Sequence, residues 1–338
     1  MGYTILFVVL GLLAIFLLVL LVRAALFSPK MELVPSEEKI FLDEKKIVED
    51  MQQLIRIKTI SYNDESLVDK AEFQKFKEIL PKLYPKVHEV CKLREIGVNG
   101  LLYHWEGKES GDPIVLMAHY DVVPVEEDQW ERDPFSGEVI DGVLWGRGTL
   151  DTKGTLCGIF EAAEKLMNEG FQPTKDVYFA FSGQEEINGP TCPAMVQWFK
   201  EQGIHPAMVV DEGGAVVENV FPGVTGECAL IGIAEKGFTN IELKQKSRGG
   251  HASMPPMHTI VGELARAVVD IENHPFKRQL TKPVKEMLDT LGRRSTFAYK
   301  ILFANMWCFE GLFDLVCKMS GGELNAMMRT TCAVTKME

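Results

Sequence analysis

The stretch Ile114-Val115-Leu116-Met117-Ala118-His119-Tyr120-Asp121 carries the pattern that decides the fold of this chain. Its five apolar residues predict a short buried strand, and a histidine and an aspartate follow where that strand ends. The apolar runs 177–181 and 208–210 have the same layout, since each leads into acidic residues. Open α/β sheets bind ligands along the carboxyl edge of their strands, so these polar side chains are expected at one edge. Acids with one histidine suit zinc, and we expect two zinc ions there.

The segments on either side of this stretch alternate between expected helices and expected strands. Helices are predicted at 43–57, 67–80, 153–168 and 193–201. Strands are predicted at 87–92, 101–105, 114–118, 176–181 and 208–210. This alternation predicts a largely parallel, layered α/β sheet. We assign residues 41–236 to a catalytic domain built on it.

The pattern changes near Gly237. Residues 239–244 alternate apolar and polar side chains, which predicts a half-exposed strand, and a helix is predicted at 259–271. A polar, glycine-bearing turn at 247–251 separates the two. Residues 237–338 are therefore expected to form a second, smaller α+β domain.

The N-terminus has a different character. Residues 4–22 are apolar after Thr4 apart from Gly11, and Arg23 ends the run. About twenty apolar residues match one bilayer crossing. Because no Lys or Arg precedes the run, residues 1–25 favour an uncleaved transmembrane anchor over a cleaved secretory signal, with a buried soluble helix as a third alternative. Residues 26–40 are predicted to be a linker.

Composition excludes some classes of function. The chain has 338 residues, enough for one large domain or two smaller ones. Its formal net charge of −12, with no basic stripe to offset it, argues against a nucleic-acid partner. The seven cysteines are dispersed and include no CxxC pair, so neither a disulfide framework nor a cysteine zinc site is expected.

His119 and Asp121 are the first candidate site residues. Two residues apart at a strand end, they can point to the same side. A metal-binding histidine usually has its second ring nitrogen held by an acceptor, often a carboxylate. We therefore interpret His119 as a metal ligand and Asp121 as its orienting partner. The alternative is a surface histidine in a loop.

The other candidates are acids. Asp151 precedes a predicted helix, where it is either an N-cap or a carboxylate that bridges two metals. Glu185 and Glu186 are adjacent, and a two-zinc site needs one carboxylate as ligand and another to accept a proton from water. We assign Glu185 as the general base and Glu186 as a ligand, with a solvated acidic loop as the alternative. Asp211 is a further candidate ligand.

Three motifs together resemble the dizinc aminoacylase/carboxypeptidase family, and within it the carboxypeptidase S and N-acyl-amino-acid hydrolase branch. They are the stretches 117–124 (MAHYDVVP), 145–154 (WGRGTLDTKG) and 182–186 (SGQEE). The turn 249–255 (GGHASMP) resembles the start of that family's lid, or dimerisation, domain. The resemblance covers about residues 40–338. It implies a zinc-peptidase-like layered catalytic domain with an inserted α+β lid.

The resemblance also assigns roles to residues. His119, Asp151 and Asp211 would hold one zinc, and Asp151 would bridge to a second zinc held with Glu186. Asp121 would orient His119, and Glu185 would activate the water. The peptide bond after Asp151 is often cis in this family.

Outside these motifs, His251 resembles the lid histidine that stabilises the oxyanion, often across a dimer. The alternative is a turn histidine. The family's second zinc takes a final histidine from the C-terminal part of the catalytic domain, and the last histidine here, His274, falls in the expected lid. We therefore expect an incomplete lid and a chain that is a truncated or partial form.

The sequence thus predicts a membrane-anchored, zinc-dependent hydrolase that cleaves an amide bond beside a free carboxylate, as a carboxypeptidase acts on peptides. One alternative is an N-acyl-amino-acid amidase or synthase, and another is an inactive, membrane-tethered binding protein. Arg23 and Lys30 after the span favour a cytoplasmic catalytic domain, but the resemblance favours an extracytoplasmic one, which we adopt. A homodimer through the lid is also expected.

Overall fold

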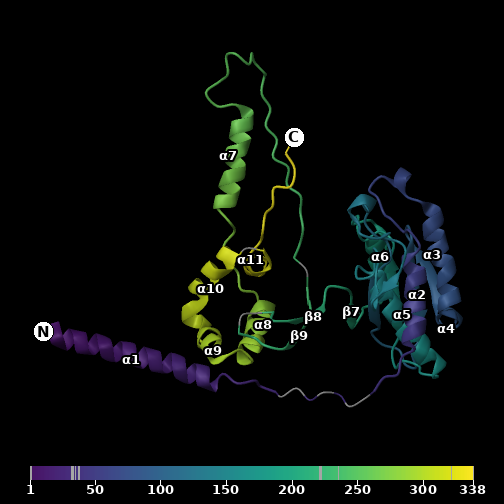
Figure 1. Cartoon of the computed structure of the whole chain (residues 1–338), viewed down its shortest axis with the longest axis horizontal. Helices are drawn as coiled ribbons and strands as arrows, with labels where there is room; N and C mark the ends of the chain where they lie inside the picture. The colour runs from purple at the N-terminus through teal and green to yellow at the C-terminus, as the bar shows by residue number, and fades with distance from the viewer. Residues whose placement is uncertain are drawn as a thin grey trace. The chain divides into compact units, whose positions relative to one another are not determined.

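The structure is a computed structural model that describes residues 2–31, 34, 36, 39–220, 223–234, 236–320 and 322–337 (Figure 1). The chain folds as two compact units. One comprises residues 37–213, and the other comprises residues 1–36 with 214–338. The division falls at Gly214, earlier than the domain boundary at residue 237 expected from the sequence. Each unit is described by itself below.

The unit of residues 37–213 is built on a mixed five-stranded sheet with the strand order β1-β2-β6-β3-β7. Its strands are β1 (Lys92–Ile96), β2 (Gly100–Trp105), β3 (Ile114–His119), β6 (Val177–Ser182) and β7 (Met208–Val210). β3 runs parallel to both β6 and β7, whereas β2 is antiparallel to β1 and to β6. The prediction of a largely parallel sheet was therefore wrong for half of the pairings. Only residues 97–99 join β1 to β2, and so short a connection permits only an antiparallel pair.

Helices cover both faces of this sheet. They are α2 (Glu44–Ile55), α3 (Lys70–Leu83), α4 (Pro85–Val90), α5 (Lys153–Asn168) and α6 (Thr191–Glu201). Leu101, Tyr103 and other odd-numbered residues of β2 and β6 pack with α2 to α5, whereas the even-numbered Leu102 packs with α6. Successive strand residues point to opposite faces, which explains the division into two cores. Short elements complete the unit: η1 (Glu65–Leu67), η2 (Glu127–Gln129) and the hairpin of β4 (Val139–Ile140) and β5 (Val143–Leu144).

The predicted strand at 87–92 was wrong, because most of this segment forms α4. Pro85 stands at the first turn of the helix, where its fixed φ favours helix formation. The carboxylate of Glu164 accepts hydrogen bonds from the backbone N–H groups of Lys86 and Val87, at 3.0 and 2.8 Å. These amides have no partner within the helix, so a residue of α5 satisfies them. No pattern local to the segment could reveal this cap.

The second unit contains α1 (Gly2–Leu26), the hairpin of β8 (Ala215–Glu218) and β9 (Glu227–Leu230), and a group of helices. These helices are α7 (Ile260–Asn273), α8 (Lys282–Arg293), α9 (Phe297–Phe303), α10 (Met306–Ser320) and α11 (Gly322–Met328). α7 confirms the helix predicted at 259–271. The strand predicted at 239–244 was wrong, because these residues are exposed and form no strand. Alternation alone does not supply the hydrogen-bonded neighbour that a strand requires.

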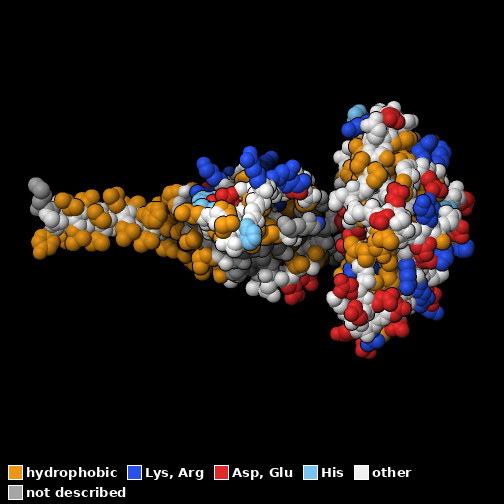
Figure 2. Space-filling view, turned by 90° about the horizontal axis from the view of Figure 1, so that it is seen from above, with side chains coloured by type: hydrophobic (Ala, Val, Ile, Leu, Met, Phe, Trp, Pro, Cys, Tyr) orange, Lys and Arg blue, Asp and Glu red, His pale blue; other side chains and the backbone are white. Residues whose placement is uncertain are grey.

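Helix α1 confirms the long apolar helix predicted at the N-terminus. It is the one helix among the described residues that is long and apolar enough to cross a membrane, and little of it is buried. Figure 2 shows apolar side chains along its visible face. Its length and composition alone fit either a membrane anchor or a signal sequence.

Substitution of Phe160, a residue of α5, tests how much the core beneath the sheet contributes to stability. Its ring is fully buried and lies against five rings, those of Tyr84, His88, Tyr103, Phe179 and Phe181. We expect Phe160→Ala to lower the free energy of unfolding of this unit by about 3–5 kcal/mol, because it removes buried surface and leaves a cavity. Native-state hydrogen exchange of the β2, β3 and β6 amides measures this loss. Leu166→Ala, at a more exposed site on the same helix, serves as the control, and an equal loss in both variants would contradict the expected role of Phe160.

Candidate metal centre

The carboxyl ends of three neighbouring strands bring the candidate site residues to one edge of the sheet. His119 is the last residue of β3, the strand between β6 and β7. Glu185 and Glu186 come soon after β6, and Glu212 soon after β7. Because β3, β6 and β7 are parallel, these ends meet at the same edge. The structure therefore brings these side chains together at the carboxyl edge of the sheet.

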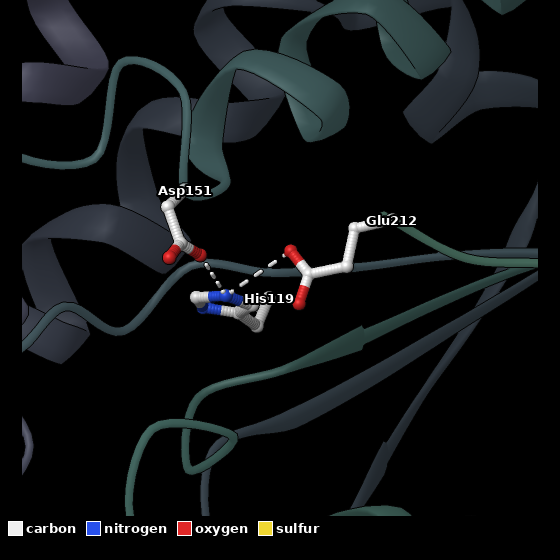
Figure 3. A group of neighbouring side chains, drawn as sticks. All are labelled: His119, Asp151 and Glu212. Atoms are coloured by element: carbon white, nitrogen blue, oxygen red, sulfur yellow. Dashed lines mark hydrogen bonds and ion pairs between the residues drawn. The ribbon is translucent and has the colours of Figure 1, made fainter. Parts of the chain in front are cut away.

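His119 lies at the centre of the cluster and is almost completely buried, with 2% exposure. Its Nε2 atom lies 2.8 Å from Oδ1 of Asp151 and 3.5 Å from Oε2 of Glu212. Figure 3 shows these two carboxylates directed at the imidazole ring from the loop before α5 and from the chain after β7. Each of the three residues offers a ligand atom, and these atoms all lie within 4.8 Å of one another. One imidazole and two carboxylates are a donor set that fits zinc.

Asp121 fixes both the histidine and the neighbouring loop. Its side chain is completely buried, and its backbone carbonyl oxygen accepts a 3.0 Å hydrogen bond from Nδ1 of His119. Its carboxylate accepts hydrogen bonds from the backbone N–H groups of Glu185 and Glu186, at 3.0 and 3.1 Å. With Nδ1 donating to a carbonyl oxygen, Nε2 is free to act as a metal ligand. The sequence suggested the Asp121 carboxylate as the partner of His119, whereas the hydrogen-bonded acceptor is the backbone carbonyl oxygen of Asp121. The carboxylate ties the end of β6 to the end of β3.

Sequence reasoning missed Ser61, which donates a 2.8 Å hydrogen bond to Oδ2 of Asp121. Ser61 is buried on the segment after α2, where Ile60 forms a parallel bridge with Val122. Thr59 lies on the same segment and donates its hydroxyl to the carbonyl oxygen of Tyr120, at 2.5 Å. A single serine about sixty residues away in the sequence carries no local signal of this contact.

Asp151 does not act as a helix N-cap. The N-cap position of α5 belongs to Thr152, whose side chain makes no capping hydrogen bond. The Asp151–Thr152 peptide bond is cis, as the family resemblance implied. The start of α5 is held instead by Lys153, a fully buried residue whose Nζ donates to the carbonyl oxygens of Leu54 and Ile57 at 3.1 and 2.7 Å.

The charges of the site favour a bound cation. Burial raises the pKa values of Glu185, Glu186 and Glu212, and neighbouring carboxylates add to the rise while His119 opposes it. Burial by itself lowers the pKa of His119, but Asp121 and Glu212 raise it to about 10. The clustered carboxylates therefore hold a proton on the imidazole in the metal-free protein. A metal ion would displace this proton and supply the positive charge in its place.

Glu212, the neighbour of the predicted ligand Asp211, is the acid after β7 that lies in the cluster around His119. The two acids are adjacent after β7, and successive residues of an extended chain point to opposite sides. The three-residue cluster of the described chain contains Glu212 and not Asp211. The role of Asp211 stays a prediction, as does that of Glu186, whose carboxyl pKa is raised by burial and then by Asp151.

His251 belongs to the other unit of the chain. It is exposed in the turn before α7, and its Nδ1 atom accepts a 3.3 Å hydrogen bond from the backbone N–H of Ser253. The hydroxyl of Ser253 lies 2.8 Å from the same nitrogen. Its predicted role at the oxyanion stays a prediction.

Comparisons with known proteins identify the family to which the chain belongs. Residues 115–291, more than half of the chain, match the model of "Peptidase family M20/M25/M40". The chain belongs to this family of peptidases. It is 37% identical over 318 residues to "Probable carboxypeptidase S-like 2" of Dictyostelium discoideum, covering 91% of this chain and 61% of that protein. It is 34% identical over 298 residues to "N-fatty-acyl-amino acid synthase/hydrolase PM20D1" of Xenopus tropicalis, covering 87% and 58%.

This M20-family chain thus spans about 60% of the length of these curated relatives. Among solved structures, it is similar to the M20 family metallo-carboxypeptidase Sso-CP2 from Sulfolobus solfataricus. That match has 22% identity and a TM-score of 0.41, and it covers 50% of this chain and 38% of the other.

The adjacent pair Asp211 and Glu212 provides a matched test of the metal centre. We expect Glu212→Gln to lower zinc affinity strongly, because it removes a charged ligand atom from the cluster around His119. Asp211→Asn also replaces a carboxylate by an amide of the same shape. We expect it to lower zinc affinity less than Glu212→Gln does. Zinc affinity is measured by competition with a chromogenic chelator. The opposite ranking of the two variants would favour the assignment made from the sequence.

Asp121 provides a second test, because it holds the site without being a proposed ligand. An amide oxygen cannot replace both carboxylate oxygens, so Asp121→Asn leaves at least one buried donor without its acceptor. We expect metal affinity to fall by about 10–100-fold, the usual effect of losing a residue that orients a ligand. Asp64→Asn, at the exposed start of η1, should leave the affinity unchanged. Wild-type affinity in the Asp121 variant would refute the role of this carboxylate in holding the Glu185 and Glu186 amides beside the site.

Proposed function

We propose that this protein is a zinc-dependent hydrolase that cleaves an amide bond next to a free carboxylate, with peptides as substrates in the manner of a carboxypeptidase. One observation carries the proposal: the imidazole of His119 lies within reach of Asp151, Glu212 and Glu185 at the carboxyl edge of the sheet. Membership of the M20 family and likeness to a carboxypeptidase S-like protein support it.

His119, Asp151 and Glu212 would hold one zinc ion. The family resemblance adds a second ion, held by Asp151 as a bridge together with Glu186. For the first ion, the resemblance assigns Asp211 where we propose Glu212. When bound, zinc lowers the pKa of water and polarises a carbonyl oxygen. The protein supplies the orientation: Asp121 directs His119 and fixes the amides of Glu185 and Glu186 in place.

Glu185 is the proposed general base. Its Oε2 atom lies 3.7 Å from Nε2 of His119, beside the proposed ligand atoms. Burial raises the pKa of this carboxyl, which moves it towards the neutral range where a general base is most effective. In the proposed reaction, Glu185 accepts a proton from the attacking water and delivers it to the leaving amine as the amide bond breaks.

His251 is proposed to donate a hydrogen bond to the oxygen that becomes negatively charged in the transition state. Its chemistry suits this role. Because Nδ1 accepts from the backbone N–H of Ser253, the proton of the neutral ring is on Nε2. The imidazole can then act as a donor without being charged.

A second candidate activity is the hydrolysis or synthesis of N-acyl amino acids. The likeness to the Xenopus synthase/hydrolase favours it. Both activities act on an amide bond beside a free carboxylate, and they differ in whether an acyl chain or a peptide precedes that bond. A panel of C-terminal dipeptides and N-acyl amino acids that share one leaving residue separates the two.

We further propose that α1 anchors the protein in a membrane, with the catalytic domain on the extracytoplasmic side. Its 25 residues correspond to about 37 Å of helix, more than the hydrocarbon thickness of a bilayer. Residues 237–338 are proposed to act as the lid and to form a homodimer.

Glu185 also provides the test of the reaction. We expect Glu185→Gln to lower kcat by about 10²–10⁴-fold, the usual contribution of a general base, while zinc content stays at the wild-type level. Elemental analysis and turnover of the substrate panel are measured on the same preparation. Glu201→Gln, at the end of α6, is the control.

The possible outcomes separate the proposals. A Glu185→Gln variant with near-normal kcat would refute the assignment of the base. A wild-type protein that binds zinc but turns over none of the substrates would support the alternative of a membrane-tethered binding protein. Removal of zinc with a chelator should abolish turnover, and added zinc should restore it.

A further inference from the structure

Helix α10 carries an apolar face that is exposed to solvent. Leu312, Leu315 and Met319 are 54%, 53% and 80% exposed, and they recur at the three- and four-residue spacing of one helical face. Trp307 at the start of the helix is 60% exposed. The opposite face is packed, because Phe313 and its neighbours belong to the core formed with α8 and α11. Large apolar residues gathered on one face, unlike single ones, mark an interaction surface.

The start of α10 is joined to the end of α1 through a buried asparagine. Asn305 has no exposed surface, and its Nδ2 donates to the carbonyl oxygen of Leu20 at 3.1 Å. Arg23 donates from Nε to Oδ1 of Asn305 at 3.0 Å and from Nη2 to the carbonyl oxygen of Ala304 at 2.9 Å. Leu20 and Ala24 are the buried residues of α1. The apolar helix and the start of α10 are therefore parts of one packed unit.

The contact between Trp307 and α1 indicates how deep the start of α10 would lie in a bilayer. Arg23 ends the apolar run, so it marks the level of the lipid headgroups if α1 spans a bilayer. Phe16 precedes it by seven residues, which corresponds to about 10 Å along the helix. The ring of Trp307 meets that of Phe16 edge-on, with centroids 6.1 Å apart. Trp307 therefore lies near the boundary of headgroups and acyl chains, where tryptophan is enriched and amphipathic helices bind.

Basic side chains surround the chain just after α1. Arg293 donates to the carbonyl oxygen of Ser28 at 2.9 Å, and Arg294 donates to that of Met31 at 3.0 Å. Lys30 pairs with Asp289 at 2.9 Å. Figure 2 shows the apolar surface of α1 continuing onto the helices that adjoin it, with Lys and Arg gathered on another side of that body. Apolar surface next to cationic surface is the arrangement that suits a bilayer interface.

From this arrangement we propose that α10 lies in the membrane interface beside α1, with Trp307, Leu312, Leu315 and Met319 in contact with lipid. The inference rests on the proposed role of α1 as a membrane span. It adds a second point of attachment, so that the unit formed by α1 and α7 to α11 contacts the bilayer through α10 as well as through α1.

A photoactivatable lipid tests the inference on the full chain. The protein is reconstituted into phosphatidylcholine vesicles that contain a phospholipid with a diazirine on one acyl chain, and labelled peptides are mapped by mass spectrometry after irradiation. We expect label on α1 and on residues 306–320. Peptides with Leu150 and Val196, which are exposed apolar residues of the other unit, give the background.

Label on α1 with α10 at background would overturn the inference and leave the anchor intact. Background label on both helices would overturn the anchor as well. Protection of α10 together with chemical crosslinks between two copies at this face would identify a second protein molecule as its partner, which also contradicts lipid contact.

A variant confirms which side chains meet the lipid. Leu312→Glu combined with Leu315→Glu and Met319→Glu should reduce the label on α10 to background while α1 keeps its label, because charged side chains leave the apolar phase. Val196→Glu is the matched control at an exposed position elsewhere and should change neither signal. Undiminished label on α10 in the triple variant would contradict the assigned face.

Discussion

The buried carboxylate of Asp121 is the constraint on which the site depends. A carboxylate without solvent is costly unless it is hydrogen-bonded, and this one accepts hydrogen bonds from two backbone amides and from the hydroxyl of Ser61. These bonds join three separate segments: the end of β3, the loop after β6 and the segment after α2. Through its backbone carbonyl, the same residue orients His119. The orientation of the proposed ligand and the position of the proposed base thus have one cause.

Much of this arrangement could be predicted from the sequence, because its signals are local. The apolar runs of β3, β6 and β7 are short and end in polar residues, so both the strands and the edge where they meet follow from the pattern. The choice between Asp211 and Glu212 could not be made in this way. It depends on which of two adjacent side chains points towards His119. The strand β7 has only three residues, all of them apolar, so its sequence does not show which side chains face which side of the sheet.

Prediction from the sequence failed where the conformation of a segment depends on partners that are distant in the chain. The segment 85–90 is a helix because Glu164 of α5 satisfies its first amides, and residues 239–244 form no strand although their side chains alternate. Ser61 belongs to the same class. It reaches the site from a place where nothing in the neighbouring residues marks it, and only the packed structure relates the two.

The position of β7 has a consequence for how the site is built. This strand has three half-exposed to exposed residues and pairs only with β3, at the edge of the described sheet. His119 is set in the packed interior, whereas Glu212 follows the least supported strand. A metal ion held between His119 and Glu212 would act as a cross-link that closes a long loop of the chain, and the entropy of closing that loop would be lost on binding. Metal affinity and the stability of the sheet edge are therefore two measures of the same equilibrium.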